Sequence, residues 1–172
     1  MSGDSGEHRT VTVEGVRLRF AAAHMATLGD ELEPLHGHNY LVLCRVDGTL
    51  TNDHWVIDFS VLKSFVRDAC ERLDHRFLLQ RNSKLIDIEE HSDVWIIRFG
   101  KREYQFPLTD VIALPIENST AELIAQWLCE TVVQSLAAGK HENLTRIEVT
   151  VEEMPGQSGS YQRELTAGWY QS

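Results

Sequence analysis

Short runs in which apolar and polar residues alternate are the strongest constraint on the fold of this chain. The cleanest is RIEVTVEE, residues 146–153. Successive side chains of a strand point to opposite faces, so such a run predicts a strand buried on one face only. Residues 10–23, TVTVEGVRLRFAAA, predict two strand segments with a bend at Glu14-Gly15. Residues 38–48, HNYLVLCRVDG, predict a further strand that pairs antiparallel with the segment before it.

Two other segments show the periodicity of an amphipathic helix. Apolar residues recur every three or four positions in FSVLKSFVRDACERL, residues 59–73, and Asp58 before it suits the helix N-cap. The second segment begins near Ser119, which together with Glu122 has the spacing of a capping box, and it ends at about Leu136. We therefore expect two helices, each with one face against a core.

The order of these elements predicts the fold class. Strand-like runs between residues 85 and 106 are separated by turn sequences and predict a hairpin or small meander between the helices. The whole order indicates an α+β domain, in which an antiparallel sheet carries two helices on one face. A length of 172 residues suits one core, so we expect a single domain over residues 1–172, with residues 162–172 as a C-terminal tail.

Composition excludes several classes of protein. Hydrophobic residues make up 42% of the chain, and no apolar run is long enough to cross a bilayer. The first eight residues, MSGDSGEH, are polar and acidic, unlike a signal peptide, so we expect a cytoplasmic protein. Three cysteines without a C-x-x-C pair argue against disulfides and a cysteine-only zinc site, and indicate core residues. The net charge of −10 argues against nucleic acid as a partner, and an anionic substrate would need a locally basic site.

The segment EPLHGHNY, residues 33–40, places two histidines one residue apart. On an extended backbone His36 and His38 project to the same face, and Gly37 between them has no side chain to obstruct. Antiparallel pairing with the preceding strand would place His24 opposite the pair. Three neutral imidazoles with one open position suit a catalytic zinc ion. The alternative is ordinary surface histidine on an exposed strand, which the spacing alone favours.

Three acidic positions offer further chemistry. Asp74 precedes His75 directly after the first helix, where the carboxylate could orient the imidazole for proton transfer, although adjacent side chains often point apart. Glu33 lies three residues before His36 and could reach a substrate bound to the metal. Glu153 ends the last strand, and its carboxylate could accept two hydrogen bonds from the amidine-like edge of a guanine or pterin ring. For each carboxylate, simple exposure to solvent is the alternative.

Six segments taken together resemble the 6-pyruvoyltetrahydropterin synthase / 6-carboxytetrahydropterin synthase family. In chain order they are RFAAAH, LHGHNY, VIDFSVLK, LDHRFLL, STAELIAQWL and VEEMP, and the similarity covers about residues 10–82 and 115–161. The resemblance implies a tunnelling fold (T-fold), in which antiparallel sheets close into oligomeric barrels, with two trimers stacked as a homohexamer and active sites at subunit interfaces. A strand-like insertion at about residues 84–114 has no counterpart in the compact members.

The resemblance also implies a site that acts on a small-molecule pterin, 7,8-dihydroneopterin triphosphate. The implied residues are the Zn²⁺ ligands His24, His36 and His38, the proton-transfer pair Asp74 and His75, and the pterin-binding residues Glu153, Ser119 and Thr120. Arg17, Arg19 and Lys63 are basic and near the matched segments, which makes them candidates for holding the triphosphate.

One departure from the family pattern bears on the reaction. Pyruvoyl- and carboxy-forming members carry a catalytic cysteine shortly before the H-x-H pair, and this chain has none between His24 and His36. Glu33 instead occupies the place used by the glutamate-bearing, cysteine-lacking branch. That branch is associated with cleavage of the C1′–C2′ bond to give 6-hydroxymethyl-7,8-dihydropterin, a folate precursor. We therefore expect a zinc-dependent lyase in which Glu33 and the Asp74-His75 pair move protons.

Three alternatives stay open. One is 6-carboxytetrahydropterin synthase activity in 7-deazaguanine (queuosine) synthesis. Another is a non-catalytic metal- and pterin-binding oligomer that lost its chemistry with the cysteine, although retention of Asp74 and His75 argues against it. The last is a structural interaction domain without a metal.

Overall fold

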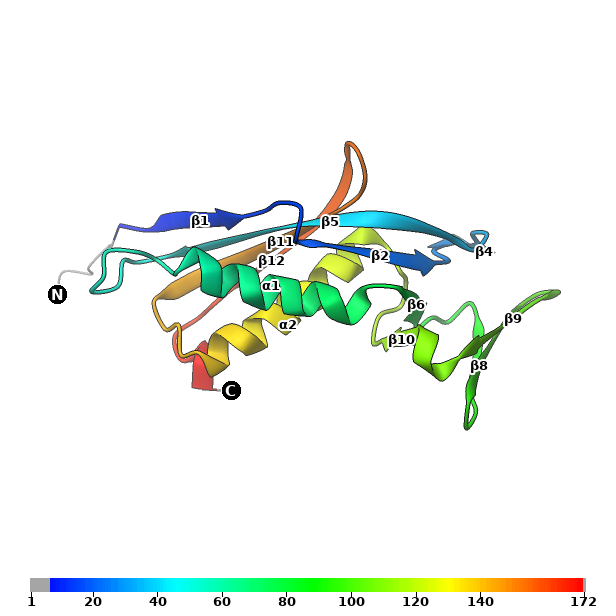
Figure 1. The fold of residues 1–172 in the computed structure, drawn as a ribbon. Helices are drawn as coiled ribbons and strands as arrows, with labels where there is room; N and C mark the ends of the chain where they lie inside the picture. Colours follow the sequence, from blue (N-terminus) through cyan, green and yellow to red (C-terminus); the bar gives the residue numbers. More distant parts are fainter. Residues whose placement is uncertain (1–6, 172) are drawn as a thin grey trace.

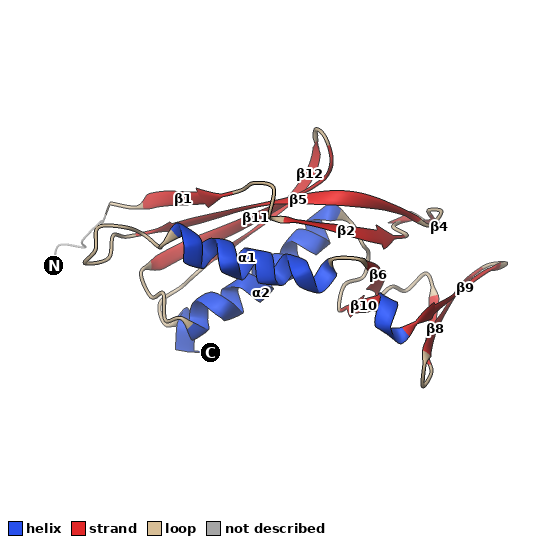
Figure 2. Cartoon of the chain, in the orientation of Figure 1, coloured by secondary structure: helices blue, strands red, loops and turns tan. Residues whose placement is uncertain are grey.

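The computed structural model describes residues 7–171 of the chain. The strands of its main sheet are β1 (Arg9–Val13), β2 (Arg19–His24), β5 (His36–Gly48), β6 (Arg76–Gln80), β10 (Val111–Leu114), β11 (Leu144–Met154) and β12 (Gln157–Glu164). They are hydrogen-bonded in the order β10-β6-β2-β5-β11-β12, and β1 also pairs with β5. The helices α1 (Phe59–Leu73) and α2 (Ala121–Ala138) both lie on one face of this sheet (Figures 1 and 2).

The predicted antiparallel pairing of the two N-terminal strands is confirmed. β2 and β5 pair so that His24 lies opposite His36 and Ala22 lies opposite His38. Strand β11 pairs antiparallel with the other edge of β5. The α+β class with two helices on one face is therefore confirmed, and β5 is the strand that links its two halves.

The sheet is mixed, whereas the sequence indicated a purely antiparallel one. Strand β6 runs parallel to both β2 and β10, and the residue patterns indicated neither β6 nor β10. RFLLQ in β6 has four consecutive buried residues after Arg76, so it lacks the alternation that marks a half-buried strand. The sequence also missed β12, because Pro155 and Gly156 form the turn of a β11–β12 hairpin rather than the end of the sheet.

The first helix begins as predicted, and the second does not. Asp58 caps α1, since its Oδ1 accepts hydrogen bonds from the backbone N–H groups of Ser60 at 2.6 Å and Val61 at 3.2 Å. The predicted capping box of α2 is wrong. Thr120 holds the N-cap position and makes no side-chain cap, whereas Ser119 is fully buried beside His24.

The main core lies between the helices and the sheet. Phe20 and Tyr40 stack within it at a centroid distance of 4.6 Å. All three cysteines, Cys44, Cys70 and Cys129, are free and buried, which confirms them as core residues. Burial raises the pKa of each thiol, so none is a ready nucleophile.

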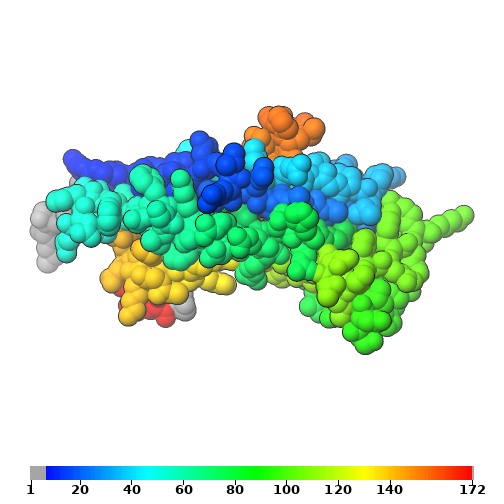
Figure 3. All heavy atoms as spheres, in the orientation of Figure 1, coloured from blue at the N-terminus to red at the C-terminus, as the bar shows by residue number. Residues whose placement is uncertain are grey.

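A small lobe, which we call the insertion lobe, stands at one end of the molecule (Figure 3). Its strands are β7 (Asp87–Glu90), β8 (Val94–Phe99) and β9 (Arg102–Pro107), an antiparallel meander as predicted. A short hairpin, β3 (Thr27–Leu28) with β4 (Glu31–Leu32), joins β2 to β5. The lobe and this hairpin share a second hydrophobic cluster: Met25, Leu32, Phe77, Leu79, Ile86, Trp95 and Ile97.

Within residues 7–171 no helix is long and apolar enough to cross a membrane. The expectation of a cytoplasmic protein was drawn from residues 1–8, and residues 1–6 lie outside the part of the chain that the structure describes. In the segment assigned to a C-terminal tail, β12 extends to Glu164, and Trp169 is buried at the start of the short 3₁₀ helix Trp169–Gln171.

Candidate functional site

Pairing of β2 with β5 brings the three histidines together. His36 and His38 project to the same face of β5, and His24 at the end of β2 lies across from them. The two strands approach closely at Gly37, where an added β-carbon would lie 2.9 Å from the carbonyl oxygen of Ala22. Glycine is therefore required between the two histidines because the neighbouring strand leaves no space for a side chain there.

The histidine side chains form a cluster with the geometry of a metal site. Ring nitrogens of His24, His36 and His38 all lie within 4.8 Å of one another. The Nε2 atoms of His24 and His38 are buried and make no hydrogen bond. A Glu153 carboxylate oxygen lies 3.2 and 3.4 Å from them without a hydrogen bond, and buried polar atoms that make no hydrogen bond are rare, so these groups together favour a cation at this point.

Backbone carbonyl groups orient two of the rings. The Nδ1–H of His24 donates to the Ser119 carbonyl at 2.8 Å, and that of His36 donates to the Pro34 carbonyl at 2.8 Å. Because a carbonyl only accepts, Nδ1 carries the proton in each ring, and the Nε2 lone pair of the neutral ring is free. Burial lowers the pKa of His24, which keeps that ring neutral. The cluster therefore fits a divalent metal such as zinc.

Glu153 reaches the same cluster from the end of β11. Its Oε1 lies 3.2 Å from His24 Nε2 and 3.4 Å from His38 Nε2, and it accepts a hydrogen bond from Tyr40 at 3.4 Å. Burial raises the pKa of Tyr40, and the charge of Glu153 adds to this effect. Sequence reasoning missed Tyr40, although its place two residues after His38 puts it on the same strand face.

Glu33 follows the β3–β4 hairpin and stands beside the cluster. Its Oε2 is 4.0 Å from His36 Nε2, and both side chains are about one-third exposed, Glu33 at 33% and His36 at 37%. The backbone N–H of Glu33 donates to the Ala26 carbonyl at 2.9 Å, which closes the hairpin. A carboxylate with this exposure and position can exchange a proton with a molecule held at the histidines.

Asp74 and His75 form a pair at the end of α1, so here the adjacent side chains do meet. His75 Nδ1 lies 2.7 Å from Asp74 Oδ2, and the Ala21 N–H donates to Asp74 Oδ1 at 2.7 Å. Burial alone would raise the pKa of Asp74, but the hydrogen bonds from Ala21 and His75 outweigh it and lower the pKa. The His75 backbone, at φ +56°, is anchored by its N–H to the Ala21 carbonyl at 2.7 Å.

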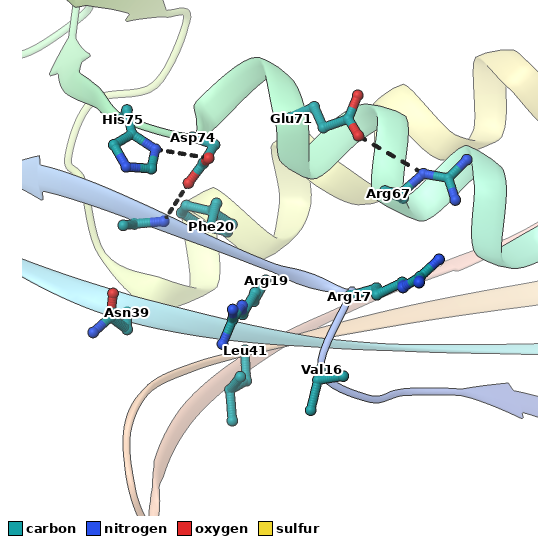
Figure 4. A pocket seen from close by; sticks show the side chains of 11 residues that line it. Val16, Arg17, Arg19, Phe20, Asn39, Leu41, Arg67, Glu71, Asp74 and His75 are labelled. Atoms are coloured by element: carbon teal, nitrogen blue, oxygen red, sulfur yellow. Dashed lines mark hydrogen bonds and ion pairs between the residues drawn. The ribbon is translucent and has the colours of Figure 1, made fainter.

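The pair borders a hollow of about 560 Å³, which we call the basic hollow (Figure 4). Its lining includes Arg19 and Ala21 of β2 and Asn39 and Leu41 of β5. Along β2 the side chains that alternate with Arg19 and Ala21 are buried toward the helices. Because side chains alternate along a strand, these four residues project away from the histidine cluster, and the hollow extends from them to Arg67 and Glu71 of α1. A second hollow of about 570 Å³ continues from His75 over Gly37, His38 and Phe106.

One chain thus brings together only part of the predicted site. The cluster comprises His24, His36, His38, Glu153, Glu33 and Ser119. Thr120, next to Ser119, begins α2. Within residues 7–171 the exposed His75, whose side chain is 82% accessible, makes no contact with the three histidines.

Comparisons with known proteins agree with this geometry. The family model for 6-pyruvoyl tetrahydropterin synthase matches residues 15–164. A putative 6-carboxy-5,6,7,8-tetrahydropterin synthase of Methanocaldococcus jannaschii is 32% identical over 149 residues, 86% of this chain and 91% of that protein. The 6-pyruvoyltetrahydropterin synthase structure of Plasmodium vivax is 34% identical, with a TM-score of 0.87, and covers 92% of this chain and 99% of that one. Two further structures of that protein carry a catalytic glutamate replaced by alanine or by cysteine.

Proposed function

This chain belongs to the 6-pyruvoyl tetrahydropterin synthase family, and on that premise we propose that it cleaves the C1′–C2′ bond of 7,8-dihydroneopterin triphosphate. The family makes it a lyase-type enzyme of pterin biosynthesis. The proposed product is 6-hydroxymethyl-7,8-dihydropterin. The observation that carries the proposal is the position of Glu33, whose Oε2 lies 4.0 Å from His36, while all three cysteines are buried in the core.

Zinc on His24, His36 and His38 is the first part of the proposal. It is supported by the two buried Nε2 atoms that make no hydrogen bond and by the two Nδ1 groups fixed by carbonyls. When bound there, zinc would act as a Lewis acid on the hydroxyl groups of the substrate side chain. Glu153 would bind the amino-pyrimidine edge of the pterin ring, since Tyr40 holds its carboxylate at the cluster.

Proton transfer falls to Glu33 and to the Asp74-His75 pair, which the fold leaves accessible. Glu33 would take or return a proton at the side chain of the bound substrate. Asp74 holds His75 Nδ1 at 2.7 Å, so His75 Nε2 is the atom that would exchange a proton with substrate. The Plasmodium vivax relative, in which a glutamate is named catalytic, supports the role of Glu33.

The separation of His75 from the histidine cluster supports an active site shared between copies of the chain. The Asp74-His75 pair borders the basic hollow at the end of α1, and His75 is 82% accessible. A second copy could present its pair to the cluster of the first, as a hexamer with sites at subunit interfaces would require. A homo-oligomeric enzyme is therefore part of the proposal, and we add to it the cytoplasmic location expected from the sequence.

The basic hollow suits the triphosphate of the substrate. Arg17 and Arg19 line it, and among residues 7–171 neither has an acidic partner. Arg67 also lines it, at 3.7 Å from Glu71. In a chain with a net charge of −10, free guanidinium groups beside His75 supply the local positive field that an anionic substrate needs. Lys63 lines an adjacent hollow with Arg17 and Arg67.

A second candidate activity is 6-carboxytetrahydropterin synthase, as in 7-deazaguanine synthesis. The names of the archaeal relatives favour it, since the proteins of Methanocaldococcus jannaschii and Pyrococcus horikoshii are both called putative 6-carboxy-5,6,7,8-tetrahydropterin synthases. The glutamate at position 33 favours the hydroxymethyl product instead. A carboxylate is a weaker nucleophile than a thiolate and serves better as a general acid or base.

Turnover of zinc-loaded protein with 7,8-dihydroneopterin triphosphate tests the proposal. We expect the wild type to consume the substrate, His36→Ala to lose both zinc and activity, and Glu33→Gln to keep about one zinc per chain but to lose about 10²–10⁴-fold in kcat. Glu31→Gln, two residues earlier in β4, is the matched control and should retain activity. A wild type that binds one zinc and the pterin but turns nothing over would instead support the non-catalytic binding oligomer.

A further inference from the structure

An arginine of the insertion lobe holds the backbone of the segment that carries Glu33. Arg102 begins β9, and its guanidinium donates to the Leu32 carbonyl at 2.6 Å and to the Glu33 carbonyl at 3.3 Å. The next carbonyl along the chain, that of Pro34, accepts from His36 Nδ1 at 2.8 Å. Three consecutive carbonyl groups are therefore bound by side chains. Those of Leu32 and Glu33 are bound by the lobe, and that of Pro34 is bound by the histidine cluster.

The surroundings of Arg102 fix its guanidinium on these carbonyls. The side chain is half-buried, and its guanidinium lies 5.1 Å from the ring centroid of Phe99. No carboxylate within residues 7–171 pairs with Arg102, so no acidic partner competes for its N–H groups. Hydrogen bonds from a charged donor are stronger than those from a neutral one, which makes this contact more than incidental packing.

Apolar packing against the insertion lobe also fixes this segment. Leu32 is 4% exposed and belongs to the second hydrophobic cluster with Trp95 and Ile97 of the lobe. On the other side of the hairpin, the Asn118 side chain binds the backbone of Thr27 at 2.8 and 2.9 Å. The residues just before Glu33 are thus anchored to the lobe, whereas the Glu33 side chain itself stays accessible.

We propose that Arg102 is a positioning residue, through which the insertion lobe sets the placement of the Glu33 carboxylate at the histidine cluster. This inference rests on the proposed catalytic role of Glu33. It gives the insertion a function: a carboxylate on a short loop between two strands needs support, because a displacement of about 1 Å at a reacting group costs about 100-fold in rate.

The test compares Arg102→Met with two variants. Arg102→Lys keeps the charge and can still donate to a carbonyl. Arg98→Met is the matched control, because Arg98 lies in the same meander and its partners, Glu89 and Glu103, both belong to the lobe. Two properties are measured in each: amide hydrogen exchange of residues 28–36, which needs no substrate, and kcat and KM with 7,8-dihydroneopterin triphosphate. Both are measured again with Glu33→Ala added.

We expect Arg102→Met to speed exchange in residues 28–36 by about tenfold and to lower kcat by about 10–100-fold, with KM and zinc content unchanged. Arg102→Lys should recover part of kcat, and Arg98→Met should resemble the wild type. When Glu33 is already alanine, adding Arg102→Met should lower kcat by less than about twofold, because Arg102 acts through Glu33.

Three results would overturn the proposal: unchanged exchange and kcat in Arg102→Met, faster exchange without a fall in kcat, or an equal fall in kcat when Glu33 is already alanine. An inactive wild type has a different meaning. It would contradict the proposed function, while the exchange data would still decide whether Arg102 holds the segment.

Discussion

Replacement of Gly37 by alanine tests how the fold builds the histidine cluster. Gly37 separates His36 from His38, and its backbone has no positive φ, so only space opposes a side chain there. The new methyl group would lie 2.9 Å from the Ala22 carbonyl oxygen and 3.4 Å from the Ala23 α-carbon. Both contacts are to the backbone of the paired strand, so β2 and β5 must move apart where they carry the histidine cluster.

The cost of this change follows from the contacts. Overpacking of this kind costs about 1–3 kcal/mol, and the restriction of the unfolded chain by alanine offsets about 0.4–1 kcal/mol of it. The net loss of about 1–2 kcal/mol should lower the melting temperature by about 2–8 °C. Because His36 and His38 shift with the strand, zinc affinity should fall by about 10–100-fold.

Thermal unfolding of the zinc-free protein and competition titration with a zinc chelator measure the two effects. Gly100→Ala is the control. Gly100 has φ +57° with open space around it, so alanine there costs stability through the backbone alone and should leave zinc affinity unchanged. If Gly37→Ala melts and binds zinc like the wild type, the close approach of the two strands places no constraint on the histidine cluster.

Three further predictions concern the other parts of the site. We mix subunits that carry His75→Ala with subunits that carry His36→Ala and reassemble the oligomer. If each site combines two copies of the chain, the mixture should regain about a quarter of the wild-type activity. No recovery would mean that His75 and His36 act within one chain. Arg19→Ala should raise KM for the triphosphate substrate by about tenfold with little change in kcat, and an unaltered KM would remove Arg19 from the phosphate site. The pKa of Asp74 is lowered from 3.8, so its negative charge stabilises the fold above that pH, and this contribution is lost as the pH falls through the folded pKa. In a circular-dichroism titration, the stability of Asp74→Asn should therefore depend less on pH below about pH 4 than that of the wild type. An unchanged acid transition would contradict this.

The sequence predicted those elements whose burial is one-sided. β2, β5 and β11 alternate because one face of each meets the helices, so their residues alone indicated their strands and placed His24 near His36. In β6 the run of four buried residues left no period to detect. The polar residues of β12 form an edge strand after Pro155 and Gly156, a pair that equally suits the end of a sheet.

Contacts between distant segments explain what the sequence could not predict about the site. Ser119 has the spacing of a capping residue, but the fold uses its carbonyl to orient His24, 95 residues away. The approach of Glu153 to His24 and His38 depends on the register of β11 with β5. Arg102 acquires a partner only because the insertion lobe packs on the β3–β4 hairpin.

Identification of the pterin product by mass spectrometry decides whether this protein cleaves the C1′–C2′ bond. Cleavage of the C1′–C2′ bond leaves one side-chain carbon on the ring and the phosphates on the two-carbon fragment. We therefore predict that zinc-loaded wild-type protein converts 7,8-dihydroneopterin triphosphate to 6-hydroxymethyl-7,8-dihydropterin. A pterin that carries a pyruvoyl or a carboxyl side chain as the main product would contradict the assignment of this reaction to Glu33.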